Sequence, residues 1–514
     1  MPDCLHVLMV LVVLTACSSP ATPVDVCETI SGDHTAPETG TRPFYHFTPP
    51  SAWMNDPAGL VWLDGEYHLF YQRDPHEVFT SDVRWGHAVS PDLLHWQDLP
   101  DALTPDAMLG MPFTGSAVVD AQNTSGLCAG NVNCLVAVFT HAFGALNSQK
   151  QSLAVSTDRG RTFQLDPHNP VLTAELSDFR DPFVRWHAPT SKWVMVVGTT
   201  GTALFYTSPD LNHWTPTSSF GLAPQGWPAV ECPNLLPLTA PDGTTHWLLK
   251  LDLNPGLLQS GASRYWLGQF DGATFTPETD KDGLRFDGPD FYAAQAFANV
   301  PDGRTLWLGW MSDWSYAMFT PTVGYRGEQS VPRQLGLAQT PDGWRLTQTP
   351  VAELATLESA CPLVSENVVA VSQDVTLAAA LGNAYVLRVD LEPPKGGEVG
   401  VRVLRGATEA TSVGYDAVRG TLFVDRGLPA GTDLPESFAA RLEVPVALVD
   451  GRLPVTVYVD RTSVEVFAAD GLAVLSVSVY PTELRHGLSA FALGGAGTLH
   501  DLTVHMLARA ARVE

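Results

Sequence analysis

The stretch SPDLLHW at residues 90–96 returns in nearly the same form, SPDLNHW, at residues 208–214. Looser versions are STDRGRTF at 156–163 and FDGATF at 270–275. Each reads as the end of a strand, an Asp-containing turn and an aromatic start to the next strand. A unit of this kind that recurs every 50 to 65 residues, roughly, indicates β-propeller blades stacked around an axis. A β-sandwich with coincidentally similar turns is the alternative.

The sequence around these repeats consists of short β-type runs, such as GLVWL and KWVMVVG, separated by Pro, Gly and Asp turns. From about residue 360 the pattern changes to dense Val-rich alternation, as in LPVTVYV, which predicts successive strands with one buried face and hence a sandwich. The predicted organisation is a propeller over residues 42–345, a linker over 346–362 and a β-sandwich over 363–514.

The composition limits the classes of partner. A chain of 514 residues exceeds what one hydrophobic core usually serves, and its 14 Trp either fill the core or offer surfaces on which sugar rings stack. A formal net charge of -26 disfavours nucleic acid and anionic lipid and favours a neutral substrate. No CxxC pair or His/Cys cluster indicates a metal site, so no metal and no cofactor are expected. The protein is expected to be a monomer.

Residues 5–16 form an apolar stretch too short to span a membrane comfortably, and it ends in LTA directly before Cys17. The pattern resembles a bacterial lipoprotein signal, in which cleavage before Cys17 and lipidation of its thiol leave an acyl anchor. It departs from that pattern because Asp3, and no Lys or Arg, precedes the apolar run; plain secretion and an unprocessed segment are the alternatives. Residues 1–17 are therefore predicted to be a lipobox signal and residues 18–41 a flexible tether. Export, with membrane contact only through this anchor, is expected.

Five cysteines remain once the two in the signal are set aside, and close pairs become oxidised in an exported protein. Cys128 and Cys134 flank a Gly/Asn turn and are predicted to form a small disulfide loop. The other three are Cys27, Cys232 and Cys361, and their odd number predicts at least one free thiol.

Three carboxylates stand in turns punctuated by aromatic residues or proline: Asp56 in WMNDPAG, Asp181 in FRDP and Glu231 in VECPNL. Retaining hydrolysis of a glycosidic bond needs two carboxyl groups about 5 to 5.5 Å apart, one to attack carbon and one to protonate the leaving oxygen. Arg180 could clamp vicinal hydroxyls or keep a carboxylate ionised, and the hydrophobic approach to Glu231 suits a proton donor. The structural alternative is that such Asp residues simply cap turns.

The motifs WMNDPAG, FTGSAV at 113–118, FRDP, ECPNL and GWMSDW at 309–314 occur in an order that resembles glycoside hydrolase family 32, the invertases, levanases and exo-inulinases. The resemblance runs from about Phe44 to the end and includes DRTSVEVF at 460–467. It implies an all-β fold, with a five-bladed β-propeller that carries the active site in an axial funnel, followed by a C-terminal β-sandwich.

Carried over by position, the resemblance implies that Asp56 is the nucleophile and Glu231 the acid/base. It implies that Asp181, with Arg180, binds fructose hydroxyls and stabilises the transition state. Asn55 would bond a sugar hydroxyl. The other implied fructose contacts are Gln72, Trp85, Phe113, Thr114, Tyr292 and Trp314, of which Trp85, Phe113, Thr114 and Trp314 have a packing role as the alternative.

Three features depart from the family pattern. Ala58 stands where the family usually has Asn. The stretch 72–88 differs in length and polarity from the common form, and Asp313 stands where many relatives carry Asn. The expected function is that of a retaining, exo-acting β-fructosidase acting on levan or inulin, with sucrose as a minor substrate. The alternatives are a sucrose-preferring invertase, a non-catalytic fructan-binding lipoprotein and a related five-bladed glycosidase acting on arabinosyl substrates.

Overall fold

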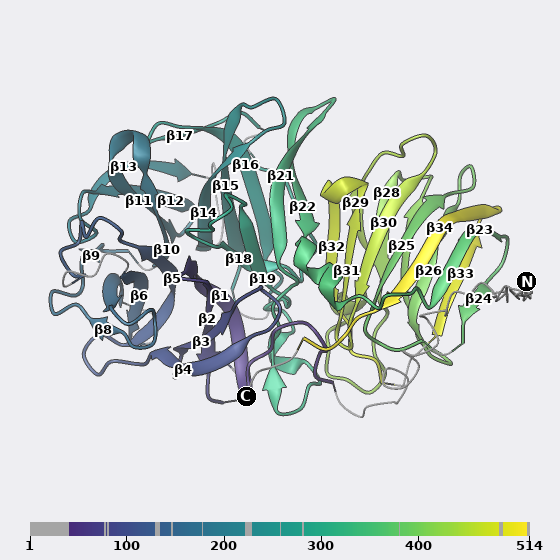
Figure 1. Ribbon diagram of the computed structural model, residues 1–514, viewed down its shortest axis with the longest axis horizontal. Helices are drawn as coiled ribbons and strands as arrows, with labels where there is room; N and C mark the ends of the chain where they lie inside the picture. The colour runs from purple at the N-terminus through teal and green to yellow at the C-terminus, as the bar shows by residue number, and fades with distance from the viewer. Residues whose placement is uncertain are drawn as a thin grey trace, which may run out of the picture.

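The computed structural model describes residues 41–76, 79, 82–128, 134–144, 148–176, 178–221, 229–256, 259–279, 282–379, 381–482 and 487–510. Its strands form two bodies, a ring of sheets at the left of Figure 1 and a pair of packed sheets at the right. The predicted signal, Cys17, Cys27 and nearly all of the predicted tether lie outside the described residues. No helix in the described segments is long and apolar enough to cross a membrane.

The first body contains, within the described residues, five sheets of four or five strands, so the propeller expectation is confirmed. Blade 1 consists of β20 (Tyr325–Arg326), β1 (Ala52–Leu63), β2 (Glu66–Asp74), β3 (Arg84–Ser90) and β4 (Gln97–Leu103). Blade 2 consists of β5 (Met111–Val119), β6 (Leu135–Phe143), β7 (Ser148–Ser156), β8 (Gln164–Leu165) and β9 (Leu172–Thr173). Blade 3 consists of β10 (Phe179–His187), β11 (Lys192–Thr199), β12 (Thr202–Ser208) and β13 (Thr215–Gly221).

The last two blades complete the ring. Blade 4 consists of β14 (Ala229–Thr239), β15 (Thr245–Asn254), β16 (Ala262–Phe270) and β17 (Phe275–Pro277). Blade 5 consists of β18 (Tyr292–Ala296), β19 (Leu306–Trp310), β21 (Arg333–Thr340) and β22 (Gly343–Pro350). The first strands of the blades, β1, β5, β10, β14 and β18, contact one another in a closed ring and therefore surround the axis.

The repeated segments of the sequence occupy one equivalent place in four blades. They join β3 to β4, β7 to β8, β12 to β13 and β16 to β17. In each turn an Asp carboxylate accepts backbone N–H groups that follow it; Asp92 accepts from Leu94 at 3.0 Å, and Asp210 accepts from Asn212 at 3.0 Å. Local hydrogen bonding of this kind is encoded by the sequence of the turn itself, which explains why the repeat is visible without a structure.

The second body is the predicted β-sandwich. One sheet contains β23 (Val364–Val371), β34 (Gly497–Met506), β25 (Tyr385–Glu392), β30 (Leu453–Val459), β31 (Ser463–Ala468) and β32 (Ala473–Ser478). The other contains β24 (Val375–Ala378), β33 (Gly487–Leu493), β26 (Glu398–Arg405), β27 (Thr411–Asp416), β28 (Thr421–Asp425) and β29 (Leu442–Pro445). Alternate Val and Leu residues of both sheets form one large hydrophobic cluster between them.

Short 3₁₀ helices accompany the strands, namely η2 (Ala188–Thr190), η3 (Ala317–Phe319), η4 (Ala352–Leu357), η5 (Glu436–Ala439) and η6 (Ala469–Gly471). The predicted end of the propeller at residue 345 falls inside β22, which continues to Pro350 because its whole length pairs with β21. The predicted linker therefore consists of the end of this strand and η4.

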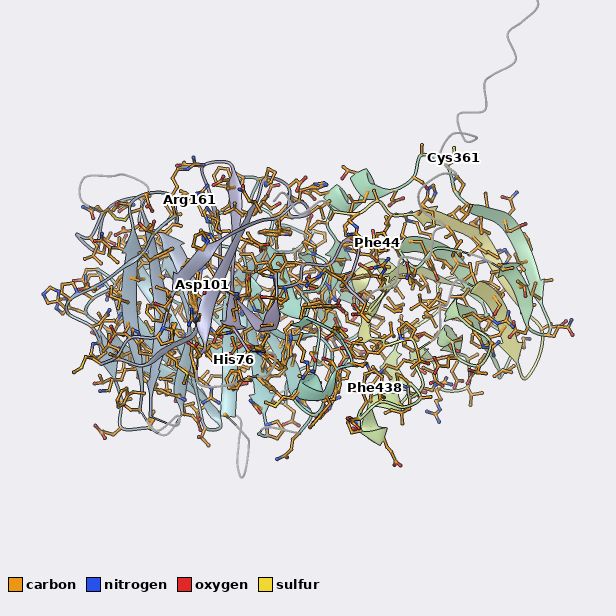
Figure 2. All side chains as sticks on the ribbon, turned by 90° about the horizontal axis from the view of Figure 1, so that it is seen from below. Phe44, His76, Asp101, Arg161, Cys361 and Phe438 are labelled. Carbon is orange, nitrogen blue, oxygen red and sulfur yellow. A yellow bond between two sulfur atoms is a disulfide. The ribbon has the colours of Figure 1, made fainter. Side chains whose placement is uncertain are left out.

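A buried ionic network joins the two bodies. His46, just before the first blade, lies 2.9 Å from Asp460 and 2.8 Å from Glu465 of the sandwich. Burial alone lowers the pKa of His46, but the hydrogen bonds and charges of these carboxylates outweigh burial and raise it to about 10. The backbone N–H of Phe44 also donates to Asp460, at 2.8 Å, and Figure 2 shows Phe44 where the bodies meet. The sandwich thus fixes the segment that leads into β1.

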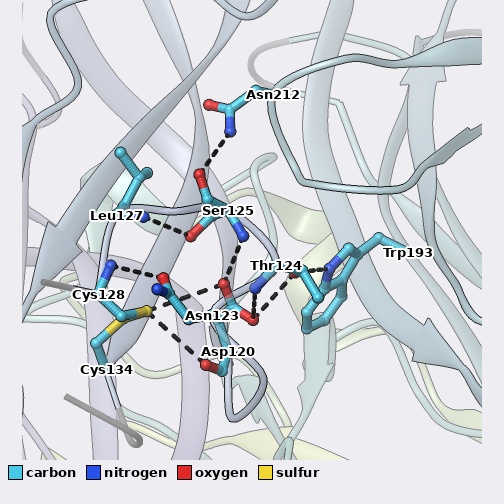
Figure 3. Close-up of a disulfide and its surroundings, with 9 residues drawn as sticks. All are labelled: Asp120, Asn123, Thr124, Ser125, Leu127, Cys128, Cys134, Trp193 and Asn212. Atoms are coloured by element: carbon cyan, nitrogen blue, oxygen red, sulfur yellow. Dashed lines mark hydrogen bonds between the residues drawn. A yellow bond between two sulfur atoms is a disulfide. The ribbon is translucent and has the colours of Figure 1, made fainter. Parts of the chain in front are cut away.

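The predicted disulfide between Cys128 and Cys134 is present at the start of β6. Figure 3 shows Asn123 and Asp120 beside it, where Cys128 N–H donates to Asn123 at 3.0 Å. Cys361 is disulfide-bonded as well, whereas Cys232 is a buried free thiol.

Candidate active site

All five innermost strands share one irregularity near their beginning. Each loses register with the next strand of its blade, as in a β-bulge, which leaves residues unpaired and redirects their side chains. Three residues at these points have left-handed backbone conformations, with φ of 63° at Asp181, 44° at Cys232 and 53° at Ala293. The shifts lie between Met54 and Pro57, Pro112 and Gly115, Arg180 and Phe183, Glu231 and Asn234, and Tyr292 and Gln295. Side chains from every blade are therefore turned together at one end of the axis.

Asp56, at the bulge of β1, has both carboxylate oxygens hydrogen-bonded. Oδ1 accepts from Asn55 Nδ2 at 2.9 Å, and Oδ2 accepts from Thr114 Oγ1 of the next blade at 2.8 Å. Burial, followed by the negative charge of Glu231, raises the pKa of Asp56 from 3.8 to about 6. The Asp56 carboxylate is thus ionised at neutral pH, although burial and the charge of Glu231 disfavour its negative charge.

Asp181 is buried, and its carboxylate and that of Asp56 both contact Cys232. The Sγ atom of Cys232 is 3.6 Å from Oδ2 of Asp56 and 3.7 Å from Oδ2 of Asp181, and the Cys232 N–H donates to that same oxygen of Asp181 at 3.2 Å. Burial, then the charge of Glu231, raises the pKa of Asp181 well above its ordinary value, against the opposing charge of Arg180. The free thiol therefore packs between two carboxylates.

Glu231 is surrounded by hydrogen-bond donors rather than by the apolar environment that its sequence suggests. Arg180 Nη2 donates to Oε1 at 2.8 Å, and Tyr292 OH donates to Oε2 at 2.7 Å. Asn254 Nδ2 lies 3.0 Å from both oxygens. Val230, directly before Glu231 on β14, packs in the hydrophobic core of the propeller instead.

Arg180 connects Glu231 to a fourth carboxylate. Its Nη1 atom also hydrogen-bonds Asp178, which in turn accepts from Thr200 at 2.8 Å. Although Arg180 is adjacent to Asp181 in sequence, the carboxylates that it pairs with directly are those of Asp178 and Glu231. The bulge of β10 begins at Arg180 and Asp181 has a positive φ, so the two adjacent side chains take different directions there.

The remaining predicted sugar contacts cluster near these groups, but several are held by protein partners. Asn55 uses its oxygen to accept from Trp53 at 2.7 Å, and Gln72 donates to the carbonyl of Pro112 at 3.2 Å. Trp85 is 0% exposed and donates to the carbonyl of Phe113, so it packs as a core residue and presents no surface to a sugar in this conformation. Trp314 stacks on Trp53 at 6.0 Å, in a cluster that also contains Cys232 and Tyr292.

Asp313 is buried and fixes a loop instead of facing open solvent. Its Oδ2 accepts from Ser260 Oγ at 2.9 Å and from Gly261 N–H at 3.1 Å. A Cβ atom on Gly261 would come within 2.6 Å of the Tyr292 ring, so the loop packs directly on the residue that donates to Glu231. Burial raises the pKa of Asp313.

Sequence reasoning missed Asn254 and a buried ion pair behind the site. Lys250 and Asp252 of β15 form this pair, and Lys250 also donates to the carbonyl of Cys232 at 3.1 Å. Two charged residues inside the apolar run LLKLDLN are unusual enough to have identified a functional strand. Nothing in the spacing of Asn254 indicates that it reaches Glu231.

Comparison with known proteins accounts for both bodies. Residues 46–350 match the family described as "Glycosyl hydrolases family 32 N-terminal domain", and residues 353–506 match "Glycosyl hydrolases family 32 C terminal". A levanase of Bacillus subtilis (strain 168) is 39% identical over 478 residues, which cover 91% of this chain and 70% of the levanase. An extracellular exo-inulinase of Aspergillus ficuum is 34% identical over 504 residues, which cover 90% of this chain and 93% of the relative.

Solved structures agree over the same span. The crystal structure of exo-inulinase from Aspergillus awamori has a TM-score of 0.84 at 30% identity, covering 92% of this chain and 99% of the other. The structure of fructofuranosidase from Schwanniomyces occidentalis complexed with fructose has a TM-score of 0.82 at 26% identity, covering 91% and 98%. Because both domains match in order and nearly the whole chain aligns with such relatives, the protein belongs to glycosyl hydrolases family 32.

Proposed function

We propose that this protein is a retaining, exo-acting β-fructosidase that removes terminal fructosyl units from levan or inulin and also hydrolyses sucrose. The observation that carries the proposal is the meeting of carboxylates from three blades: Asp56 and Asp181 share the Cys232 thiol, and the charge of Glu231 raises the pKa of both. A site with clustered carboxylates of shifted pKa suits acid/base and nucleophilic work on a neutral sugar.

In the first step, a carboxylate oxygen of Asp56 attacks the anomeric carbon of the terminal fructosyl unit. A C–O bond forms to Asp56 as the glycosidic C–O bond breaks, and Glu231 gives its proton to the departing oxygen. Thr114 and Asn55 hold the Asp56 oxygens before attack. Since the pKa of Asp56 is about 6, it is ionised and nucleophilic at neutral pH.

In the second step, Glu231 removes a proton from water, and the water oxygen displaces Asp56 from the anomeric carbon. Net retention results from the two displacements, and fructose leaves with both carboxyl groups restored. This mechanism predicts that the Asp56 and Glu231 carboxyl groups stand about 5 to 6 Å apart in a crystal structure. A separation beyond about 9 Å would contradict retention.

Asp181 is proposed to bind hydroxyls of the fructosyl unit and to stabilise the positive charge that develops on the ring. Arg180, Tyr292 and Asn254 are proposed to position Glu231, since each donates a hydrogen bond to it. The remaining proposed fructose contacts are Asn55, Gln72, Phe113, Thr114 and Trp314. Of these, Thr114 is supported by its direct bond to Asp56.

Two substrates separate the roles of the carboxylates. Asp56→Ala should lose nearly all turnover on levan and on an aryl fructoside, because no covalent intermediate can form. Glu231→Ala should retain more activity on the aryl fructoside, whose good leaving group needs no proton. Asp181→Asn should lose activity on both substrates together, because the lost contact is to the shared fructosyl unit. Equal losses for Glu231→Ala, with leaving-group dependence for Asp181→Asn, would show that the proton donor is misassigned.

Product analysis tests the mode of attack. Fructose alone from levan and inulin supports exo attack, whereas a ladder of oligomers supports endo attack. The names of the relatives, levanase and extracellular exo-inulinase, support fructans over sucrose as the main substrate. A higher kcat/KM on sucrose than on either fructan would favour an invertase, and no release of reducing sugar would favour a binding lipoprotein.

Export is supported by the extracellular relative, and lipid anchoring by the apolar run before Cys17. Cys17→Ser should release the enzyme from the membrane fraction without loss of activity. Unchanged fractionation would contradict the anchor. Sedimentation of the released enzyme tests the proposal that it acts as a monomer.

A further inference from the structure

The axial channel of the propeller contains a cavity of about 540 Å³ beyond the carboxylate cluster. Its walls come from later residues of the innermost strands, such as Leu60 of β1, Arg185 of β10 and Pro237 of β14. Asp181 and Arg185 belong to one strand, and four residues of strand span about 13 Å. The cavity therefore lies at the opposite end of the channel from the catalytic groups.

Arg185 is the charged group of β10 in this cavity, and it has no anionic partner among the described residues. Its Nη1 atom donates to the carbonyl of Leu235 at 3.1 Å, and its guanidinium lies 5.1 Å from the ring centroid of Trp247. Its Nε–H is buried and has no acceptor among the described residues. Burial lowers the pKa of Arg185 to about 10, as expected for a cation withdrawn from water without a counterion.

One neutral group adds to the excess of donors. The side-chain Nε2 of Gln295, on β18, is buried in this cavity and also lacks an acceptor within the described residues. Arg304 lines the cavity as well, but Asp302 and Glu353 pair with its guanidinium and compensate its charge. Of the described residues that line the cavity, none is acidic. Among the described residues, Arg185 is therefore the lining cation that has no ion pair.

We propose that this cavity binds a small oxyanion, with Arg185 as its charged ligand and Gln295 as a neutral donor. An oxyanion can accept from a guanidinium and an amide at once, and charge-assisted bonds of this kind are among the stronger ones. A cavity of about 540 Å³ holds such an ion together with several waters. The bound ion would connect β10 to β18 across the axis and so stabilise the propeller, independently of fructan hydrolysis.

Calorimetric melting of the full chain in phosphate, sulfate or acetate, against sodium chloride of equal ionic strength, tests the proposal. The Tm of the wild type should rise saturably, by about 2 °C when one oxyanion reaches roughly ten times its Kd. Arg185→Met should abolish the shift and keep near wild-type hydrolysis of fructan. Arg345→Met is the matched control, because Arg345 donates to backbone carbonyls at a surface turn, and it should retain the shift.

An equal shift in Arg185→Met, or no oxyanion-specific shift in the wild type, would overturn the proposal. Fructose is a further arm, because Trp186 and Trp193 also line the cavity and could stack on a sugar. An Arg185-dependent rise in Tm with fructose but not with oxyanions would overturn the proposal and identify a sugar site instead. If Arg185→Met does not fold, wild-type crystals soaked in selenate decide the matter. Anomalous density beside Arg185 supports the site, and its absence refutes it.

Discussion

Asp56 is ionised in a place that disfavours its charge, so replacing it by asparagine should stabilise the fold while abolishing hydrolysis. Burial, followed by the charge of Glu231, raises the pKa of Asp56 from 3.8 to about 6. Each pKa unit corresponds to about 1.4 kcal/mol, so ionising Asp56 in the folded protein costs about 3 kcal/mol at pH 7. Asparagine removes this cost and keeps the shape.

Part of the gain is lost again through hydrogen bonding. The amide NH₂ of asparagine would face Thr114 Oγ1 or Asn55 Nδ2, both of which donate to the carboxylate. One such mismatch costs about 1–2 kcal/mol. The free energy of unfolding of Asp56→Asn at pH 7 should therefore exceed that of the wild type by about 1–2 kcal/mol.

The pH dependence provides the sharper assay. Because the folded-state pKa is raised, the wild type is most stable with respect to this group below pH 3.8 and loses that stability as pH rises through 6. Guanidinium unfolding at pH 7 and pH 3.5 should show the advantage of Asp56→Asn only at pH 7.

Asp92→Asn is the control, because its free energy of unfolding should change in the opposite direction. Burial alone raises the pKa of Asp92, but hydrogen bonds from His95 and Leu94 lower it overall, so this variant should lose stability at pH 7. A destabilised Asp56→Asn at pH 7, or an advantage that persists at pH 3.5, would refute the reasoning.

Three further results are expected. Asn254→Leu removes a donor that lies 3.0 Å from both oxygens of Glu231 and should lower kcat/KM about 10- to 100-fold with an unchanged circular dichroism spectrum; wild-type kinetics would exclude a positioning role. In the wild type, kcat/KM should fall below about pH 6 as Asp56 takes up a proton, and a flat profile down to pH 4 would contradict its role as nucleophile. His46→Leu should lower the free energy of unfolding by about 3–5 kcal/mol, because it leaves buried carboxylates unpaired. It should also remove the loss of stability that the wild type shows between about pH 6.5 and 10, since the pKa of His46 is raised only while His46 is paired with the sandwich. A variant with the wild-type pH dependence would exclude this role of His46.

The fold and the main carboxylates could be predicted because their signals are local. Asp92 and Asp210 bind N–H groups two and three residues ahead, and turns of this kind recur in the sequence of four blades. Val-rich alternation likewise encodes the buried face of each sandwich strand. The motif WMNDPAG around Asp56 is recognisable from seven consecutive residues, which span the bulge of β1.

What only the tertiary structure decided are contacts between blades that are distant in sequence. Thr114 reaches Asp56, and Asn254 and Arg180 converge on Glu231, from strands whose patterns specify a buried face but not a neighbour at the axis. The register shifts that turn these side chains inward leave no periodic mark in the sequence. The sequence therefore determined which residues are buried and how each blade turns, whereas the closure of the ring determined the partners of each carboxylate.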